Sequence, residues 1–535
     1  MMKRYIKFIL SILVLTVISC NDLTEEVYSD LTSDTYKYTA NEIYAVTGPV
    51  YSNLRGYYNR GHIMLDITTD ITCLPANASG WDDGGIYKKM HLHTWNAEAS
   101  QVSSMWSLFY SGVIHANRII NQLETDAVPV PAGVSKESLI AEMKVARAFY
   151  YWQVIDNFGD APFVTDVSQE LPGSTTRKTI YDAIVADIVA SLDKLSTDNN
   201  KAMYGRFNKW AAKALLATLY LNSEVYTGTP EWNKCLTECN DIIASGKYIL
   251  EQNYGDNFKA NNENSVETVF AIPMDEINGS NVYINSTLHA SSKQKYNLRT
   301  TPYGAGAIKA IPQFIDTYDP EDSRIDDTWE HGPQFAADGV TPLKCLYDRA
   351  GQQLDYTKDI ANGLYTPENE GYRIIKYKPE IGATNPMNND IPFFRYAHVL
   401  MMKAECLLRT AQADAAADIV TQVRQRAFKS NPAKATVTGT QLSGNSKYQY
   451  GYVDNYVISE PGDQSPVQYG GFYDELGYEF ACEWTRRRDM IRFGTYSTKS
   501  WLSHKPQGDK INVFPYPQSF LDANPNYQQN PDYAK

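Results

Sequence analysis

Residues 396–427 read YAHVLMMKAECLLRTAQADAAADIVTQVRQRA and contain two apolar stripes with helical spacing. The stripes consist of Tyr396, Leu400, Ala404, Leu407 and Leu408, and then of Ala416, Ile419, Val420, Val423 and Ala427. A five-residue turn, Thr410 to Asp414, separates the two helices. A helix-turn-helix unit of about 34 residues with small residues at the crossing is typical of tetratricopeptide repeats.

Similar helical segments fill the N-terminal half of the chain. The segment 101–123 has a stripe with small residues in its middle, formed by Met105, Leu108, Gly112, Ala116, Ile119 and Leu123. We expect a second helix after Ser135 and a third across residues 180–192. A further pair covers 210–221 and a segment in which Thr229 is the N-cap, Pro230 the first helical residue and Gly246 the end.

Helical periodicity fades in two long stretches that are rich in Asn, Gly, Pro, Asp and Tyr. The first runs roughly from residue 249 to 392, and the second from 430 to about 470. Loops of this length inside a folded chain are uncommon and usually functional. We therefore expect binding surfaces in these stretches and in the segment 63–95, with the helical pairs as the scaffold.

The N-terminus reads as an export signal. Lys3, Arg4 and Lys7 precede an apolar run at residues 8–18. This run is too short to span a bilayer, which requires about 20 residues in a helix. The run ends at Val17-Ile18-Ser19-Cys20, which supplies the small residue and the thiol of a bacterial lipobox. We expect residues 1–19 to be removed and Cys20 to be lipidated; a plain secretory signal or a membrane anchor is the alternative.

Composition narrows the class of partner. Removal of residues 1–19 leaves 46 basic against 62 acidic side chains, a net charge of about −16, which disfavours nucleic acid as a partner. The 39 tyrosines and 9 tryptophans exceed the needs of the core, so many lie near the surface, where such rings suit sugars and protein interfaces. The six cysteines after Cys20 are too scattered for a dense disulfide scaffold.

Four segments in the C-terminal half of the chain resemble the SusD/RagB family. Residues 478–494, YEFACEWTRRRDMIRFG, are similar to a helix of that family, with Trp484 where glycine is commoner. Residues 512–517 and 524–533, NVFPYP and NPNYQQNPDY, resemble its closing segment, and FRYAHVLMMKAE at 394–405 resembles another of its helices. For Arg486, Arg487 and Arg488 inside the first helix, we expect internal ion pairs.

The resemblance implies an all-α fold in which tetratricopeptide-like helical pairs form a superhelical scaffold, decorated by large irregular loops with minor β structure. Residues 20–535 then form one domain. Its helices lie roughly at 101–248 and 393–428, its loop-rich binding region at 249–392 and its C-terminal family segment at 429–535.

The resemblance also implies a function. Such proteins are lipid-anchored at the cell surface in the outer membrane, bind oligo- or polysaccharides without cleaving them, and cap a SusC-like TonB-dependent transporter during nutrient uptake. Two alternatives remain open: a RagB-type receptor for peptides and a lipid-anchored glycoside hydrolase, which needs only two suitably spaced carboxylates.

The glycine-rich segment 77–87 is the first candidate for a ligand site. Neutral sugars are bound by aromatic rings that stack on their C–H faces and by hydrogen bonds to their hydroxyls. We expect Trp81 to be such a platform, with Asp82 and Asp83 as acceptors and Asp70 as a weaker neighbour. The alternative is that Trp81 packs the loop onto the helices.

A second candidate group lies in the irregular middle of the chain. It consists of Tyr296, Arg299, Tyr303 and Trp329, with Arg373 further along. The spacing of these residues shows nothing by itself, and the prediction depends on the resemblance.

The sequence offers little for catalysis, cofactors or metals. No HExxH, GxSxG, Walker-type or dinucleotide-binding motif occurs, and we predict neither a cofactor nor a metal site. His91 and His93 lie on alternate residues without a nearby third ligand, which favours a structural role.

Overall fold

The computed structural model describes residues 38–167, 170–275, 277, 287–302, 308–383 and 388–533, with only the backbone for residues 57–64 and 532. The predicted export signal, Cys20 and Tyr303 lie outside these residues. Within them, no helix combines the length and the apolar character that crossing a membrane requires.

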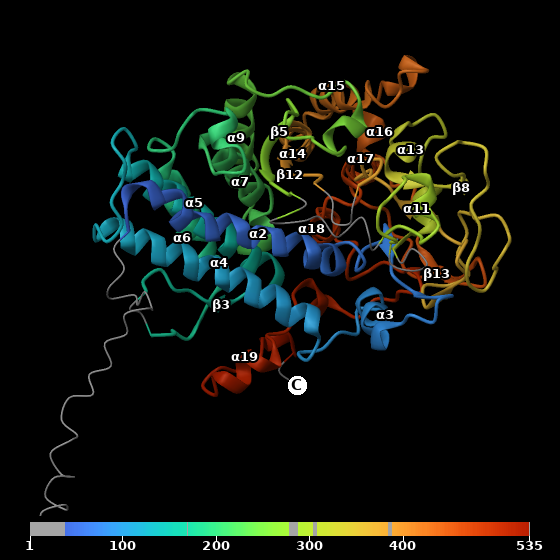
Figure 1. Cartoon of the computed structure of the whole chain (residues 1–535), viewed down its shortest axis with the longest axis horizontal. Helices are drawn as coiled ribbons and strands as arrows, with labels where there is room; N and C mark the ends of the chain where they lie inside the picture. Colours follow the sequence, from blue (N-terminus) through green and yellow to red (C-terminus); the bar gives the residue numbers. More distant parts are fainter. Residues whose placement is uncertain are drawn as a thin grey trace, which may run out of the picture.

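Long helices build one half of the molecule (Figure 1). They are α2 (Ile43–Leu65), α4 (Ser100–Glu124), α5 (Lys136–Phe158), α6 (Arg177–Ser191), α7 (Lys209–Leu221), α9 (Trp232–Ala244), α14 (Tyr396–Arg409) and α15 (Ala413–Arg424). Neighbours in this series pack on one another, and α14 packs on both α9 and α15 although some 150 residues separate it from α9 in sequence. The expected tetratricopeptide-like helical scaffold is therefore confirmed.

Local signals explain some of the helix boundaries. The side chain of Ser135 accepts a hydrogen bond of 3.1 Å from the backbone N–H of Ser138 and so caps α5. The predicted start of α9 is wrong: Pro230 precedes the helix, which begins at Trp232. Gly246 follows its end with φ of 64°, a left-handed conformation that suits glycine.

The sequence analysis missed α2, because Gly48, Pro49 and Gly56 interrupt its apolar pattern. Its N-terminal part is nevertheless well buried, with Ile43 and Val50 fully covered. Packing of α2 against α4 compensates for weak local propensity.

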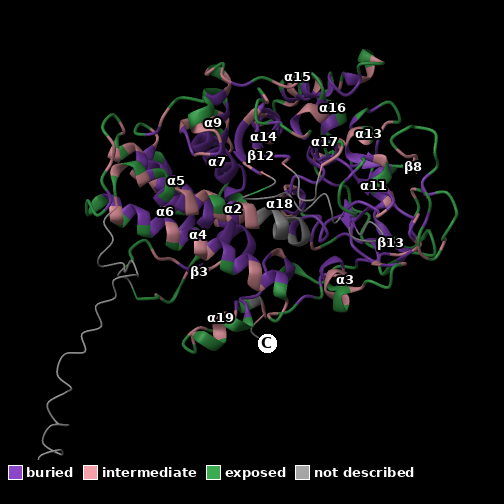
Figure 2. Cartoon of the chain, viewed as in Figure 1, coloured by how far each residue is buried: buried purple, intermediate pink, exposed green. Residues whose placement is uncertain are grey.

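Short strands and helices fill the other half, where Figure 2 shows exposed outer loops around a buried interior. A four-stranded sheet has the order β1 (Thr72–Cys73), β6 (Lys309–Ala310), β11 (Arg373–Ile374), β7 (Trp329–Glu330). A three-stranded sheet has the order β14 (Val457–Glu460), β13 (Gly451–Asp454), β15 (Trp501–Leu502). The two-stranded pairs are β2 (Ala76–Asn77) with β10 (Tyr365–Thr366), β5 (Thr268–Ile272) with β12 (Ile391–Arg395), β3 (Ala161–Pro162) with β4 (Ser174–Thr175), and β8 (Gly332–Pro333) with β9 (Asp355–Tyr356).

Short helices connect these strands and close the chain. They are α3 (Ile86–His91), α8 (Ser223–Thr227), α11 (Ser292–Lys295), α12 (Pro312–Ile315), α13 (Arg324–Thr328), α16 (Gly439–Ser443), α17 (Gly470–Phe480), α18 (Arg486–Arg492) and α19 (Gln518–Ala523).

A buried ion network joins the two halves. The guanidinium of Arg395, fully buried at the start of α14, donates to carboxylate oxygens of Glu267, Glu479 and Glu483, each at 2.7 Å. Arg426, just after α15, also donates to Glu267 and Glu479. These buried charges compensate one another, so the network fixes α14, α15, α17 and β5 relative to one another.

Candidate ligand-binding site

Trp81 lies at the surface of the loop-rich half, where 37% of the residue is exposed. Its ring stacks on that of Tyr87, in α3, with ring centroids 5.2 Å apart and planes tilted by 25°. Burial, together with the charge of Asp83 and a hydrogen bond to it, raises the pKa of Tyr87 to about 12. Two stacked rings form a flat, partly exposed apolar surface, which we call the Trp81 platform.

A tight turn holds the Trp81 platform in place. The backbone N–H of Asn77 donates to the carbonyl of Trp81 at 3.2 Å, and the Asn77 side chain accepts from the N–H and hydroxyl of Ser79. Gly80 turns the chain with φ of 83°, where a side chain would be strained. The platform is therefore fixed by its own backbone.

The two predicted acidic neighbours of Trp81 differ in their environment. Asp82 is half-buried and forms an ion pair of 2.8 Å with Lys88. Asp83 is exposed. The ion pair balances one carboxylate, and both remain able to accept hydrogen bonds from hydroxyl groups.

Asp70 requires a correction. It is fully buried, and Arg486 donates to its two carboxylate oxygens at 2.7 and 2.9 Å. The hydroxyls of Tyr450 and Tyr473 donate to it as well, at 2.9 and 3.1 Å. Asp70 therefore anchors helix α18 and does not face a ligand. The expected internal ion pair is confirmed for Arg486.

Among the described residues of the second predicted group, only two line the same hollow. Tyr296 and Trp329 line a hollow of about 590 Å³, within the range of ligand pockets. Other residues of its wall are Lys295, Glu330, His331, Gln334, Lys378 and Ile381. Lys295 donates to Glu330 and Gln334 at 2.6 and 2.8 Å, and the hydroxyl of Tyr296 donates to Glu330 at 2.9 Å.

The individual residues of this group have different roles. Trp329 is only 1% exposed, with its ring edge-on to Phe314, so it is no stacking platform. Arg373 is fully buried and donates to the backbone carbonyls of Glu368, Glu370 and Gly371, which makes it structural. Both predictions are corrected. Arg299 is exposed, and its backbone N–H donates to Ala383, close to Ile381 at the hollow.

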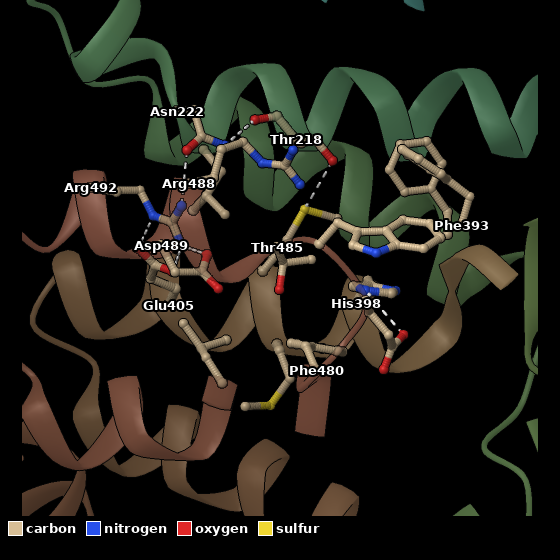
Figure 3. Close-up of a pocket in the computed structure, with 17 residues that line it drawn as sticks. Thr218, Asn222, Phe393, His398, Glu405, Phe480, Thr485, Arg488, Asp489 and Arg492 are labelled. Carbon is tan, nitrogen blue, oxygen red and sulfur yellow. Dashed lines mark hydrogen bonds and ion pairs between the residues drawn. The ribbon is translucent and has the colours of Figure 1, made fainter. Parts of the chain in front are cut away.

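An interior cavity between α7, α14 and α18 has a different character (Figure 3). Its volume of about 50 Å³ suits water and is too small for a sugar. Around it, Arg492 donates to Asn222 at 2.9 Å and to both oxygens of Glu405 at 2.7 Å (Figure 3). These contacts belong to the helical core.

His91 and His93 are buried, as a structural role requires, and the fold adds His504 to them. The rings of His93 and His504 lie 4.0 Å apart, and Trp501 packs on His504 at 3.9 Å. Sequence reasoning missed His504 because more than 400 residues separate it from His91. It also gave no role to Glu330 and Lys295, for which the sequence carries no signal.

The protein thus combines a scaffold of helical pairs with a loop-rich half that carries an exposed aromatic platform and a hollow. This arrangement is suited to ligand binding. Two family models match this chain. One, described as starch-binding associating with outer membrane, covers residues 33–221, and the other, the SusD family, covers residues 244–513. The second match spans half of the chain, so the protein belongs to the SusD family.

Curated relatives and solved structures agree with this assignment. The starch-binding protein SusD of Bacteroides thetaiotaomicron is 26% identical, with 89% of this chain and 86% of that protein aligned. SusD-like protein P25 of Formosa agariphila is 24% identical over 96% and 95% of the two chains. A laminarin-binding SusD-like protein shares the fold with a TM-score of 0.67 at 19% identity, covering 93% of this chain and all of that one.

Proposed function

We propose that the protein is a glycan-binding lipoprotein of the cell surface, anchored through Cys20 in the outer membrane. It captures oligo- or polysaccharide without cleaving it and caps a SusC-like TonB-dependent transporter that takes the ligand up. Family membership and the names of its starch- and laminarin-binding relatives support this proposal.

The observation that carries the proposal is the Trp81 platform. It combines an exposed, stacked pair of rings with the carboxylates of Asp82 and Asp83 on a backbone held by hydrogen bonds. This is the chemistry by which neutral sugars are recognised: a flat apolar face next to hydrogen-bond acceptors. The hollow that Tyr296 lines provides a second region for contact.

Affinity gel electrophoresis with starch, laminarin and other polysaccharides in the gel tests the site. Trp81→Ala should lower the affinity for the retarding polysaccharide roughly tenfold, the equivalent of about 1.4 kcal/mol. Trp81→Phe, which keeps a ring, should retain most of it. Tyr44→Ala is the matched control, because Tyr44 is an exposed aromatic residue on α2.

Full retardation of Trp81→Ala would refute the site. Release of oligosaccharides by the purified protein would favour a hydrolase, and binding of peptides without any glycan would favour the peptide receptor. Co-purification of the full-length lipoprotein with a TonB-dependent transporter from outer membranes tests the capping role.

A further inference from the structure

Tyr365 is an exposed aromatic residue that the Trp81 platform does not include. It lies in β10, 48% of the residue is exposed, and its hydroxyl has no hydrogen-bond partner among the residues that the structure describes. Its neighbour Leu364 is 39% exposed. A contiguous exposed apolar patch is a common feature of ligand-binding surfaces.

The backbone places Tyr365 beside the Trp81 turn. β10 pairs in parallel with β2, in the register Tyr365 with Ala76 and Thr366 with Asn77. Paired residues of parallel strands point to the same side, and both Asn77 and Thr366 are buried while Ala76 and Tyr365 reach the surface.

Trp81 lies on the other side of β2. The N–H of Ala76 donates to the Leu364 carbonyl, toward β10, whereas the N–H of the next residue, Asn77, donates to the Trp81 carbonyl. Successive N–H groups of a strand point in opposite directions, so β2 runs between the two aromatic residues. Hydrogen-bonded neighbouring backbones lie about 4.8 Å apart, and β2 is the neighbour of both Trp81 and Tyr365. The backbones of Trp81 and Tyr365 therefore lie about 10 Å apart.

The segment that carries Tyr365 is firmly held. The side chain of Asn362 accepts from the N–H groups of Leu364 and Tyr365 at 2.9 and 3.2 Å. The N–H of Gly363 donates to the Ser503 hydroxyl at 2.8 Å, and a side chain at position 363 would collide with His91. Tyr365 is therefore presented by an ordered backbone and not by a loose loop tip.

We propose that Tyr365 is a second stacking platform, so that the site binds an extended neutral oligosaccharide chain laid across β2 from Trp81 to Tyr365. The inference rests on the proposed glycan binding and adds the length of the ligand to it. The local charges agree with a neutral ligand, because the cation beside Trp81, Lys88, is already paired with Asp82. Two rings on either side of one strand suit separate sugar units of one chain.

Isothermal titration with sugars of two lengths tests this inference. The probes are maltose with maltohexaose and laminaribiose with laminarihexaose. In the series that binds, the wild type should prefer the hexamer. Tyr365→Ala should weaken hexamer binding roughly tenfold and leave dimer binding within about twofold, whereas Trp81→Ala should weaken both.

Tyr365→Phe keeps the ring and should bind the hexamer nearly as well as the wild type, which separates stacking from a role of the hydroxyl. Tyr44→Ala again serves as the exposed aromatic control. If Trp81→Ala loses binding while Tyr365→Ala binds both lengths like the wild type, the second platform is refuted and the proposed function stands. If the folded wild type binds neither these sugars nor any polysaccharide, both proposals are refuted.

Discussion

Glu479 shows how much a single residue contributes to this fold. Its carboxylate is fully buried in α17 and accepts hydrogen bonds from Arg395 at 2.7 Å, from Arg324 at 3.2 Å and from Arg426. Despite burial, which opposes ionisation, these cations hold the pKa of Glu479 well below its ordinary value. Glu479 thus shares in the compensation of three buried guanidinium groups.

Glu479→Gln keeps the shape of the side chain and removes that charge. We expect a loss of about 3–5 kcal/mol in the free energy of unfolding, because the buried arginines lose a compensating partner. Urea denaturation followed by circular dichroism measures it. The matched control is Glu460→Gln, since the exposed pair of Glu460 with Lys505 should contribute at most about 1 kcal/mol. Equal losses in the two variants would contradict this account.

The same scale shows where sequence reasoning fails. Asp70 looks like a candidate ligand residue in a polar turn, but its partner Arg486 lies 416 residues away and only the fold brings the two together. Trp329 and Arg373 are misjudged for the same reason, since the sequence does not show that both are buried. Trp81 could be predicted to be exposed because glycines and polar residues surround it.

Trp484 has a backbone conformation that large side chains rarely adopt. Its φ of 59° is in the left-handed region, which favours glycine. Such a conformation is strained for a large side chain. The indole is nevertheless 97% buried beside the interior cavity, so packing compensates for the strain.

At the scale of elements, the crossing of α4 and α5 depends on one glycine. A Cβ atom at Gly112 would lie 2.2 Å from the ring of Tyr150. Tyr150 has no room to retreat, because it is buried and its hydroxyl is held by the carbonyl of Val50. The stripe of small residues in segment 101–123 predicts such a close approach, and the structure confirms it.

Gly112→Ala should therefore destabilise the protein by about 1–3 kcal/mol through overpacking. Gly48→Ala is the control. A Cβ at Gly48, in α2, meets no atom within 4 Å, so alanine there should be neutral or stabilise the helix by up to about 1 kcal/mol. Thermal unfolding of both variants measures the difference. If the Gly112→Ala protein is as stable as the wild type, α4 and α5 must leave room for a methyl group at their crossing, contrary to this account.

Helices with a continuous apolar stripe could be predicted from the sequence, and α4, α5, α6, α7, α14 and α15 all lie where the pattern puts them. The pattern failed at α2 and in the strands. Strands of two residues, such as β2 and β10, are too short to carry a period, and their pairing joins positions almost 300 residues apart. The path from Trp81 to Tyr365 is therefore visible only in the structure.

At the scale of the whole molecule, the loop-rich half is held together by contacts between distant parts of the chain. His91 and His93 follow the Trp81 turn, and His504 comes from the C-terminal part. Burial lowers the pKa of His91 to about 4 and that of His93 to about 3, and it holds the pKa of His504 well below its ordinary value. The nearby cation of Arg487 lowers the pKa of His93 further.

These histidines make the stability of the whole fold depend on pH. In the unfolded chain their pKa is about 6.5, so between about pH 4 and 6.5 the unfolded state binds protons that the folded state does not. The stabilisation is complete above pH 6.5 and is lost as the pH falls. Asp66 acts in the opposite direction, because burial raises its pKa to about 8. The effect of the histidines must therefore be measured as a difference between variants.

His504→Gln removes one such group. The free energy of unfolding of this variant, measured in urea between pH 6 and 4.5, should fall less steeply with acidification than that of the wild type. The two slopes should differ by about 1.4 kcal/mol per pH unit. The comparison of slopes separates this effect from the lower overall stability that the lost packing on Trp501 causes at every pH. If the pH dependence of unfolding has the same slope in His504→Gln as in the wild type, His504 is protonated in the folded protein. The buried surroundings of His504, which include His93, His91 and Trp501, argue against a protonated ring.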